Sequence, residues 1–204
     1  MPGTDNANAL PDDLPVPIDD GACDHLKAGG LALPRGLALA ATDGRSVDLA
    51  TLAGQTVVYC YPRTGEPDKG SPAGWDEIPG ARGCTPESCA FRDHFAELRA
   101  LGVDQLFGLS TQETDYQKEA AARLRLPFAL LSDADLRFVT ALRLPTFATA
   151  GMTLVKRLTL VLRDGVVQHC FYPVFPPDQH AGEVVAWFRQ KAARGRLAPV
   201  SEQP

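Results

Sequence analysis

The chain has 204 residues, of which 45% are hydrophobic and 22% are charged, and its net charge is −5; these values are ordinary for one soluble globular domain with tails. The acidic balance argues against nucleic acid or an anionic membrane surface as the main partner, and no stretch approaches the ~20 apolar residues that a membrane helix needs. Five cysteines are an odd number at low density, unlike the disulfide framework of a small secreted protein.

Residues 1–30 are expected to form an N-terminal arm, partly disordered, that lies on the domain. They are acidic and rich in proline, and they follow neither a helical nor a strand period. They also lack the basic start and the apolar run of a signal peptide, so we expect a cytoplasmic protein. Cys23 and His25 are too few ligands for a metal site, and Cys23 is expected on the surface of the arm.

Two β-rich segments follow the arm. Residues 37–52 contain a short strand, an Asp43-Gly44 turn and a second extended piece, which predicts a hairpin. Residues 56–62 (TVVYCYP) are a short apolar run that ends at a proline, as is typical of a buried strand. Cys60 in this run, and Cys170 in a later apolar run, are expected to be core residues.

A loop dense in Gly and Pro, residues 63–83, leads to a predicted helix. Thr85 fits the N-cap, Pro86 suits the first helical position and Glu87 suits the positive end of the helix. The apolar face of this helix continues to Gly102 through Phe91, Phe95, Leu98 and Leu101. Cys84 therefore lies one residue before the expected start of the helix.

The remainder of the chain alternates strands and helices. Strands are expected at 103–110, 128–133, 157–162 and 166–173, and helices at 112–126, 133–144 and 178–194. The last two strands are joined by Arg163-Asp164-Gly165 as a second hairpin. This order predicts an α/β fold with a mixed central sheet flanked by helices, a domain over residues 31–194 and a polar C-terminal tail over residues 195–204.

Cys84 is the strongest candidate for a reactive group. Free backbone N–H groups and the positive end of a helix dipole stabilise a thiolate, which is the reactive form of cysteine. Arg82 either adds positive charge to the site or is a solvated loop arginine. The alternative for Cys84 is an inert packing cysteine, which is disfavoured because a Gly-Pro loop at the start of a helix is seldom part of a core.

Cys89 follows Cys84 at a C-x4-C spacing. This is not the C-x-x-C spacing of thioredoxin-like reductases, and no second pair exists to complete a zinc site. On an intact helix, residues five apart have Cα atoms roughly 8.6 Å apart, whereas a disulfide needs less than about 7 Å. A Cys84–Cys89 bond therefore requires the first turn to unwind, and spacing alone favours Cys89 as a core residue.

The run YCYPRTG…GCTPESCAFRDHFAEL resembles the active-site region of peroxiredoxins, most closely the bacterioferritin comigratory protein branch, or peroxiredoxin Q. That branch carries a GCT-x-x-x-C-x-x-RD stretch, which is matched here by Cys84, Thr85, Cys89, Arg92 and Asp93. The resemblance continues through FGLSTQ, LPFALLSD and RLTLVLRDG and covers about residues 31–190. It implies a thioredoxin-like fold and a thiol peroxidase.

Three residues of this chain match functional positions of that family. Cys84 matches the peroxidatic cysteine, Cys89 the resolving cysteine, and Arg157 the arginine that opens a late strand. The guanidinium of Arg157 would stabilise the thiolate and hold a peroxide oxygen. The resemblance also implies hydrogen peroxide or an organic hydroperoxide as substrate, thioredoxin or a similar dithiol as reductant, and no metal or organic cofactor; the chain is expected to be a monomer or a homodimer.

The chain departs from the family's P-x-x-x-T-x-x-C signature between Pro62 and Cys84. Ala81 stands where the signature has threonine, and the segment is about 15 residues longer than in the signature. Thr64 is either the source of the missing hydroxyl or an ordinary loop threonine. Trp75, inside the insertion, is either a local anchor or a lid over the site.

Two other functions remain open from the sequence alone. One is a redox sensor or binding module that changes partners through a Cys84–Cys89 switch, and the other is a thiol–disulfide oxidoreductase on the same fold. Within the peroxidase hypothesis, Cys23 is the alternative to Cys89 as the residue that resolves the sulfenic acid of Cys84.

Overall fold

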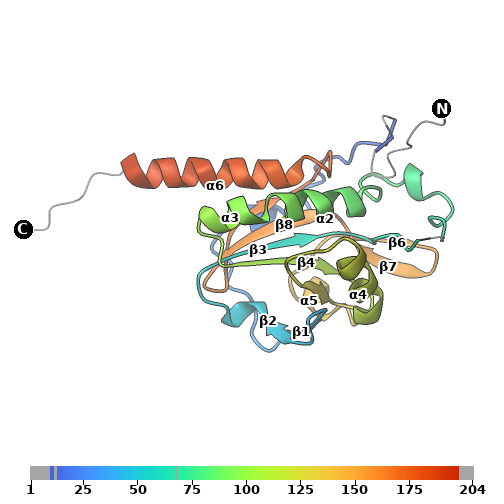
Figure 1. The fold of residues 1–204 in the computed structure, drawn as a ribbon, viewed down its shortest axis with the longest axis horizontal. Coiled ribbons are helices and arrows are strands. Elements are labelled where there is room, and N and C mark those ends of the chain that lie inside the picture. The colour runs from blue at the N-terminus through green and yellow to red at the C-terminus, as the bar shows by residue number, and fades with distance from the viewer. Residues whose placement is uncertain (1–9, 12, 68, 198–204) are drawn as a thin grey trace, which may run out of the picture.

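The computed structural model describes residues 10–197 except 12 and 68. Its centre is a seven-stranded mixed sheet in the order β2-β1-β5-β4-β3-β8-β9, and a separate two-stranded sheet pairs β6 with β7 (Figure 1). The strands are β1 Ala38–Ala41, β2 Ser46–Asp48, β3 Gln55–Cys60, β4 Gln105–Ser110, β5 Leu130–Ser132, β6 Thr146–Thr149, β7 Met152–Val155, β8 Leu158–Arg163 and β9 Val166–Phe171. The helices are α1 Asp24–Lys27, α2 Cys84–Asp93, α3 Phe95–Ala100, α4 Thr114–Arg123, α5 Arg137–Ala141 and α6 His180–Leu197, with 3-10 turns at Leu49–Thr51 and Trp75–Glu77.

Strand β3 is the best-protected part of the sheet. All six of its residues are buried, and it pairs in parallel with β4 and antiparallel with β8. An apolar, β-branched run with helices on both faces produces this kind of strand. The parallel β3-β4-β5 unit and the antiparallel β8-β9 pair together make the mixed α/β sheet that the sequence predicts.

The two faces of the sheet carry separate hydrophobic clusters because side chains alternate along each strand. On one face, Val57, Tyr59 and Tyr61 pack with residues of α2, α3 and α6. On the other face, Val58 and Cys60 pack with residues of β8, β9, α5 and the segment around α1. Figure 1 shows α6 lying alongside α2 and α3 on one side of the sheet.

Both predicted hairpins are present. β1 and β2 pair with Leu39 opposite Val47, and β8 and β9 pair with Arg163 opposite Val166. Gly165 in the second turn has a φ of +74°, and a Cβ atom there would lie 2.4 Å from the carbonyl oxygen of Ala50. This turn therefore needs glycine, both for its left-handed backbone and for its close approach to a neighbouring segment.

The helix predicted after the Gly-Pro loop differs from the observed one at both ends. Its N-cap is Gly83, with a φ of +105°, so Cys84 is the first helical residue and Thr85 is not the cap. The chain approaches too closely for a side chain at this position: a Cβ on Gly83 would lie 2.3 Å from Pro177. The helix also breaks at His94, where α2 ends and α3 begins, although the apolar face continues across the break.

The prediction for Cys23 is wrong. Its exposed fraction is 0%, and it packs with Leu26 in the hydrophobic cluster beneath β9. The described part of the arm is fastened there by backbone pairing, since Ala32 bridges to Val166 and the Gly30 N–H donates to the Val167 carbonyl at 2.8 Å. The sequence shows no period here because the contact is made with a strand about 140 residues further along the chain.

The ends of the predicted domain are only partly described. Residues 1–9 and 12 of the arm and 198–204 of the tail lie outside the described residues, so the predicted disorder and the division into arm, domain and tail stay predictions. Helix α6 continues to Leu197, beyond the expected boundary at 194. Among the helices that the structure describes, none is long and apolar enough to cross a membrane.

Candidate active site

Cys84 begins α2 and faces groups that come from two neighbouring strands. Its Sγ accepts the Arg63 N–H at 3.4 Å and the Arg157 Nη2–H at 3.3 Å, and its thiol donates to the Ala81 carbonyl at 3.6 Å. Arg63 lies in the loop after β3, and Arg157 directly precedes β8, which pairs with β3. The sheet therefore brings the loop donor and the guanidinium to the start of the helix. The structure places two of the three predicted site residues, Cys84 and Arg157, in direct contact.

Arg157 is buried and its donors have several acceptors. Nη2 donates to Cys84 Sγ and to the carbonyl groups of Ala81, at 3.4 Å, and Arg82, at 3.2 Å. Nη1 is paired with the carboxylate of Glu87, which is also fully buried. A planar guanidinium can hold all of these partners at once, which a lysine ammonium cannot.

Glu87 is the site residue whose role the sequence did not reveal. The sequence predicts only that Glu87 suits the positive end of the helix. In the structure it lies one turn after Cys84 on the same side of α2. The sequence signal for this role is an acidic residue three positions after a reactive cysteine on the same helix. The signal was weak because nothing local indicates that the carboxylate is buried against an arginine 70 residues away.

The pKa of the Cys84 thiol reflects burial against these charges. Burial raises its pKa above the ordinary value, while Arg157 and the Arg63 N–H lower it and Glu87 raises it further. The net direction is upward. The prediction of a favoured thiolate took account of the helix start and a nearby cation, but not of the burial of the thiol. Arg157 is thus the main group that favours the thiolate in this site.

The guanidinium of Arg82 does not add positive charge next to the Cys84 sulfur, which was one of the two hypotheses for this residue. Its guanidinium pairs with Asp76 at 3.0 Å, and both side chains are exposed. Only its backbone carbonyl takes part in the site, as an acceptor for Arg157. Arg82 therefore fits the interpretation as a solvated loop arginine.

Cys84 opens onto a cavity of about 470 Å3. Four cations line it (Arg63, Lys69, Arg82 and Arg123), along with the acidic Glu66. The insertion supplies much of the wall, including Pro67, Ser71 and Trp75. Trp75 is buried and packs with Ala81 and Leu154, so it anchors the insertion against the β6–β7 hairpin while also lining the cavity.

The structure does not bring the Thr64 hydroxyl to Cys84 in place of the missing threonine. Thr64 is fully buried, its N–H donates to Gln112 Oε1 at 3.1 Å, and its hydroxyl lies 3.4 Å from the same oxygen. Tyr116 donates its hydroxyl proton to the Thr64 carbonyl at 2.8 Å. Thr64 thus fixes the loop between β3 and the insertion. At position 81 it is the alanine carbonyl that contacts the sulfur.

Cys89 lies on α2 together with Cys84, and all five cysteines are without a disulfide. It is buried, and its thiol interacts with the side chain of Arg92. Because the helix is intact between the two cysteines, their Cα atoms are roughly 8.6 Å apart by helix geometry. The structure therefore does not bring the predicted resolving residue into contact with Cys84.

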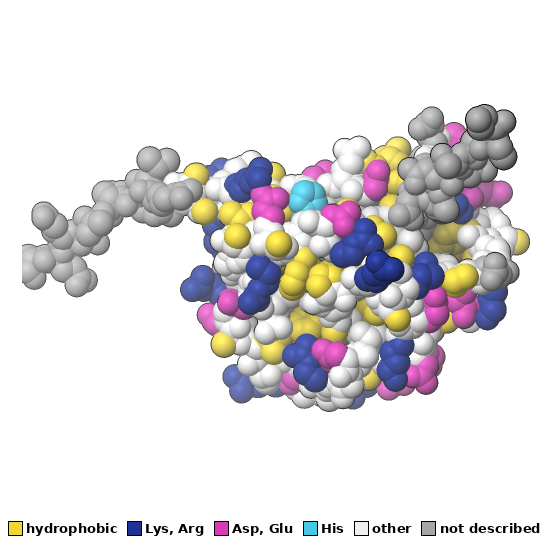
Figure 2. Space-filling model, in the orientation of Figure 1, with side chains coloured by type: hydrophobic (Ala, Val, Ile, Leu, Met, Phe, Trp, Pro, Cys, Tyr) yellow, Lys and Arg dark blue, Asp and Glu magenta, His cyan; other side chains and the backbone are white. Residues whose placement is uncertain are grey.

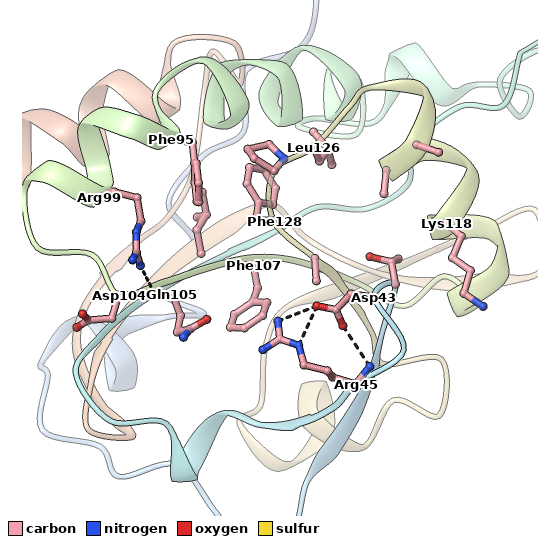
Figure 3. Close-up of a pocket in the computed structure, with 16 residues that line it drawn as sticks. Asp43, Arg45, Phe95, Arg99, Asp104, Gln105, Phe107, Lys118, Leu126 and Phe128 are labelled. Atoms are coloured by element: carbon pink, nitrogen blue, oxygen red, sulfur yellow. Dashed lines mark hydrogen bonds and ion pairs between the residues drawn. The ribbon is translucent and has the colours of Figure 1, made fainter.

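A larger cavity, of about 670 Å3, is separate from this site and shares none of its lining residues. Figure 3 shows Phe95, Phe107 and Phe128 around it, with the Asp43–Arg45 ion pair and Arg99 at its edges. Its cations already have partners, since Arg45 pairs with Asp43 at 2.7 Å and Arg99 donates to the Val103 carbonyl. Figure 2 likewise shows acidic and basic side chains interspersed over the viewed face.

Replacing Glu87 by glutamine is expected to lower the pKa of the Cys84 thiol. Glutamine keeps an acceptor for Arg157 but removes the negative charge that raises this pKa. We also expect the free energy of unfolding to fall by about 1–3 kcal/mol, because buried Arg157 loses its ion partner and keeps a neutral one. Titration of the ultraviolet absorbance of the thiolate measures the pKa, and denaturant unfolding measures the stability.

The matched control for this substitution is Glu97→Gln. Glu97 is on α3 and pairs with His94 and Arg189 rather than with the site. It should leave the titration of Cys84 unchanged. A rise in the Cys84 pKa in Glu87→Gln would mean that Glu87 acts by orienting Arg157 more than by its charge.

Comparison with known proteins gives a consistent set of relatives. The family model described as Redoxin matches residues 15–185. The chain is 35% identical over 145 residues to peroxiredoxin Q, chloroplastic, of Oryza sativa subsp. japonica, covering 70% of this chain and 58% of that protein. It is 31% identical over 172 residues to peroxiredoxin Bcp of Escherichia coli (strain K12), covering 82% of this chain and 98% of that protein.

Solved structures of related proteins have the same fold. Peroxidoxin BcpB from Mycobacterium tuberculosis has a TM-score of 0.63 at 26% identity, covering 79% of this chain and 96% of that chain. Xanthomonas campestris peroxiredoxin Q has a TM-score of 0.62 at 24% identity, covering 79% and 97%, a likeness that concerns the fold alone. This chain spans less than two thirds of several plant relatives, such as 58% of the Oryza sativa protein and 64% of the Triticum aestivum one.

Proposed function

This chain belongs to the Redoxin family, in the peroxiredoxin Q and bacterioferritin comigratory protein branch, and from this we propose that it is a thiol-dependent peroxidase with Cys84 as the attacking residue. The observation that carries the proposal is the contact of Cys84 Sγ with the Arg157 guanidinium and the Arg63 N–H at the start of α2. A guanidinium and a backbone N–H are donors that stabilise a thiolate, and the sulfur they contact lies beside a cavity that a small substrate can enter.

The proposed reaction is in-line attack on a hydroperoxide. The Cys84 thiolate attacks the distal oxygen, the O–O bond breaks, and protonation of the leaving oxygen gives water or an alcohol. Cys84 becomes a sulfenic acid. The Arg157 Nη2–H and the Arg63 N–H both reach the sulfur, so they are also the donors that can stabilise the charge that develops on the two peroxide oxygens.

Resolution is proposed to occur by condensation of the sulfenic acid with the Cys89 thiol, which forms a disulfide and releases water. The first turn of α2 must unwind for this, since its Cα–Cα distance of roughly 8.6 Å has to shrink below about 7 Å. The start of α2 supports this step because Gly83 provides no side chain to cap it. Thioredoxin or a similar dithiol would then restore both thiols by exchange.

Replacing Cys89 by serine is expected to trap Cys84 as the sulfenic acid. The variant should react with its first equivalent of peroxide at the normal rate, overoxidise more readily and depend on an external monothiol for turnover. Mass spectrometry of the intact protein after peroxide treatment measures the sulfenic and sulfinic forms. Peptide mapping of the oxidised wild type under non-reducing conditions should give a Cys84–Cys89 peptide.

The alternative resolving residue is Cys23, and the structure makes it the harder route. Cys23 packs on the face of the sheet opposite to Cys84, in a separate hydrophobic cluster. It would have to leave the core before it could reach the sulfur. A Cys23–Cys84 peptide from the wild type, within one chain or between two, would refute resolution by Cys89 and leave the peroxidase proposal intact.

Turnover separates the peroxidase from the alternatives. With thioredoxin and its reductase present, a peroxidase consumes many equivalents of peroxide per chain, whereas a sensor without a client stops after one. A thiol–disulfide oxidoreductase would instead reduce a disulfide substrate without peroxide.

The proposal has three further parts. The substrates are hydrogen peroxide and organic hydroperoxides, the protein is a monomer or a homodimer, and it acts in the cytoplasm.

A further inference from the structure

Three of the five cysteines lie together on the face of the sheet away from Cys84. Cys23, Cys60 and Cys170 have exposed fractions of 0%, 0% and 3%, and all three belong to one hydrophobic cluster. Cys84 belongs to the cluster on the other face. Among the described residues no group of cysteine, histidine and acidic side chains is arranged to hold a metal ion. We therefore consider the reactions that these three cysteines can undergo as thiols.

Two of these cysteines are neighbours. Cys23 immediately precedes α1, the short helix packed on β9, which carries Cys170, and the two side chains interact. Backbone pairing of the arm with Val166 and Val167 holds the two segments in register. Cys60 is on β3, which β8 separates from β9, and it is opposite Leu158, whereas Cys170 is opposite Leu160. Cys60 is close enough to interact electrostatically with both other thiols, so it is the competing partner that a test must exclude.

We propose that Cys23 and Cys170 form a second redox-active pair, which hydroperoxide oxidises to a disulfide. In the first step one thiol attacks the peroxide, the O–O bond breaks, and the products are a sulfenic acid and water or an alcohol. In the second step the other thiol displaces water from the sulfenic acid and the S–S bond forms. The pair loses two electrons to one peroxide molecule, so no further oxidant is required.

Cys23 is the thiol that peroxide should reach first. It stands beside exposed residues, Gly21 and Asp24, and before a helix of only four residues with no side-chain cap. Local opening of such a short element exposes the thiol without breaking the sheet, whereas Cys170 is held inside β9. The interaction with Cys23 and burial both raise the pKa of the Cys170 thiol, which also disfavours it as the first nucleophile.

The disulfide would fasten a segment that reaches the back of the active site. Ahead of Cys23, Asp20 pairs with Lys156 at 2.9 Å and accepts the Tyr172 hydroxyl proton at 2.9 Å. Lys156 is next to Arg157, and the same stretch of the arm lines a cavity of about 520 Å3 that Arg157 also borders. Oxidation of the pair therefore anchors the arm beside Arg157, at a cavity that Cys84 does not line. Its effect is to hold this region folded when peroxide is in excess.

The experiment uses the full chain with Cys84→Ser and Cys89→Ser, so that its outcome is independent of the proposed peroxidase reaction. After prolonged treatment with hydrogen peroxide we expect the loss of two titratable thiols and a Cys23–Cys170 peptide in a non-reducing digest. The thermal midpoint should rise by roughly 5–10 °C, because the bond closes a loop of more than a hundred residues, and dithiothreitol should reverse the shift.

Two further variants in the same background make the result specific. Cys60→Ala should keep the cross-linked peptide, while Cys23→Ala, at the end of the arm, should lose both the peptide and the thermal shift. A Cys23–Cys60 peptide, unchanged thiol content, or sulfinic acid on Cys23 without a cross-link would each overturn the proposal.

Discussion

Replacing Cys84 by serine is expected to reduce peroxide consumption by on the order of a thousandfold or more, because a hydroxyl is a far poorer nucleophile than a thiolate at neutral pH. The side chain is nearly isosteric and only 3% exposed, so the fold should be retained. The hydroxyl can still accept the Arg157 and Arg63 donors that now reach the sulfur. The loss should therefore appear in the rate of the chemical step, measured by stopped flow with hydrogen peroxide.

A cysteine outside the site provides the control for this substitution. Cys60→Ala changes a fully buried cysteine at the end of β3, on the face of the sheet away from Cys84. It should keep the rate of the peroxide step while it lowers the stability somewhat. If the Cys84→Ser protein consumed peroxide as fast as the wild type, the assignment of the nucleophile, and the peroxidase function built on it, would fall.

Replacing Arg157 by lysine is expected to slow sulfenic acid formation at neutral pH by about 10- to 100-fold. A single ammonium group cannot keep the contacts to Cys84, to the two backbone carbonyls and to Glu87 that the guanidinium makes at once. Because Arg157 lowers the pKa of the Cys84 thiol against the effect of burial, that pKa should rise in the variant. The thiolate fraction then falls at neutral pH and recovers as the pH increases.

The pH profile of the peroxide step distinguishes this effect from simple unfolding. In Arg157→Lys the rate should climb toward the wild-type value as the pH is raised through the elevated pKa, with only the loss of oriented donors remaining at high pH. Arg163→Lys is the control: Arg163 is an exposed arginine at the far end of β8, the strand that Arg157 precedes, and the rate of this variant should not change. An unchanged profile in Arg157→Lys would show that another cation serves Cys84.

The parts of the fold that the sequence predicted correctly are those with a local period or a local turn. The buried strand at residues 56–62, both hairpins and the helices over 112–126 and 178–194 follow from alternation, from glycine turns and from helical spacing. The β6–β7 hairpin was missed, although Ala150 and Gly151, with φ values of +47° and +73°, form its turn. Alanine is not a residue that signals such a turn.

The residues of the candidate site also fall into those that a local sequence pattern predicts and those that it does not. Cys84 could be found from its place between a Gly-Pro loop and a helix, but Arg157 could be named only from the resemblance to a family. The burial of Glu87 against Arg157 and the packing of Cys23 and Cys170 in one cluster join segments far apart in the chain. Composition and spacing do not report such contacts. The neighbouring sequence also does not explain why position 81 lacks the threonine of the family signature. The contact with the sulfur is made by the backbone carbonyl of Ala81, which a residue of any type would supply.

The central position of β3 gives the two halves of the site different mechanical properties. Arg63 follows this strand, and Arg157 precedes β8, which pairs with β3 along its whole length. Cys84, by contrast, is held at the end of a helix whose first turn has no side-chain cap. The sheet is therefore the fixed part of the site, and the start of α2 is the part that the proposed resolution step moves. In the proposed resolution step the sulfur leaves while the Arg63 N–H and the Arg157 guanidinium stay with the sheet, so the returning thiol meets the same two donors again.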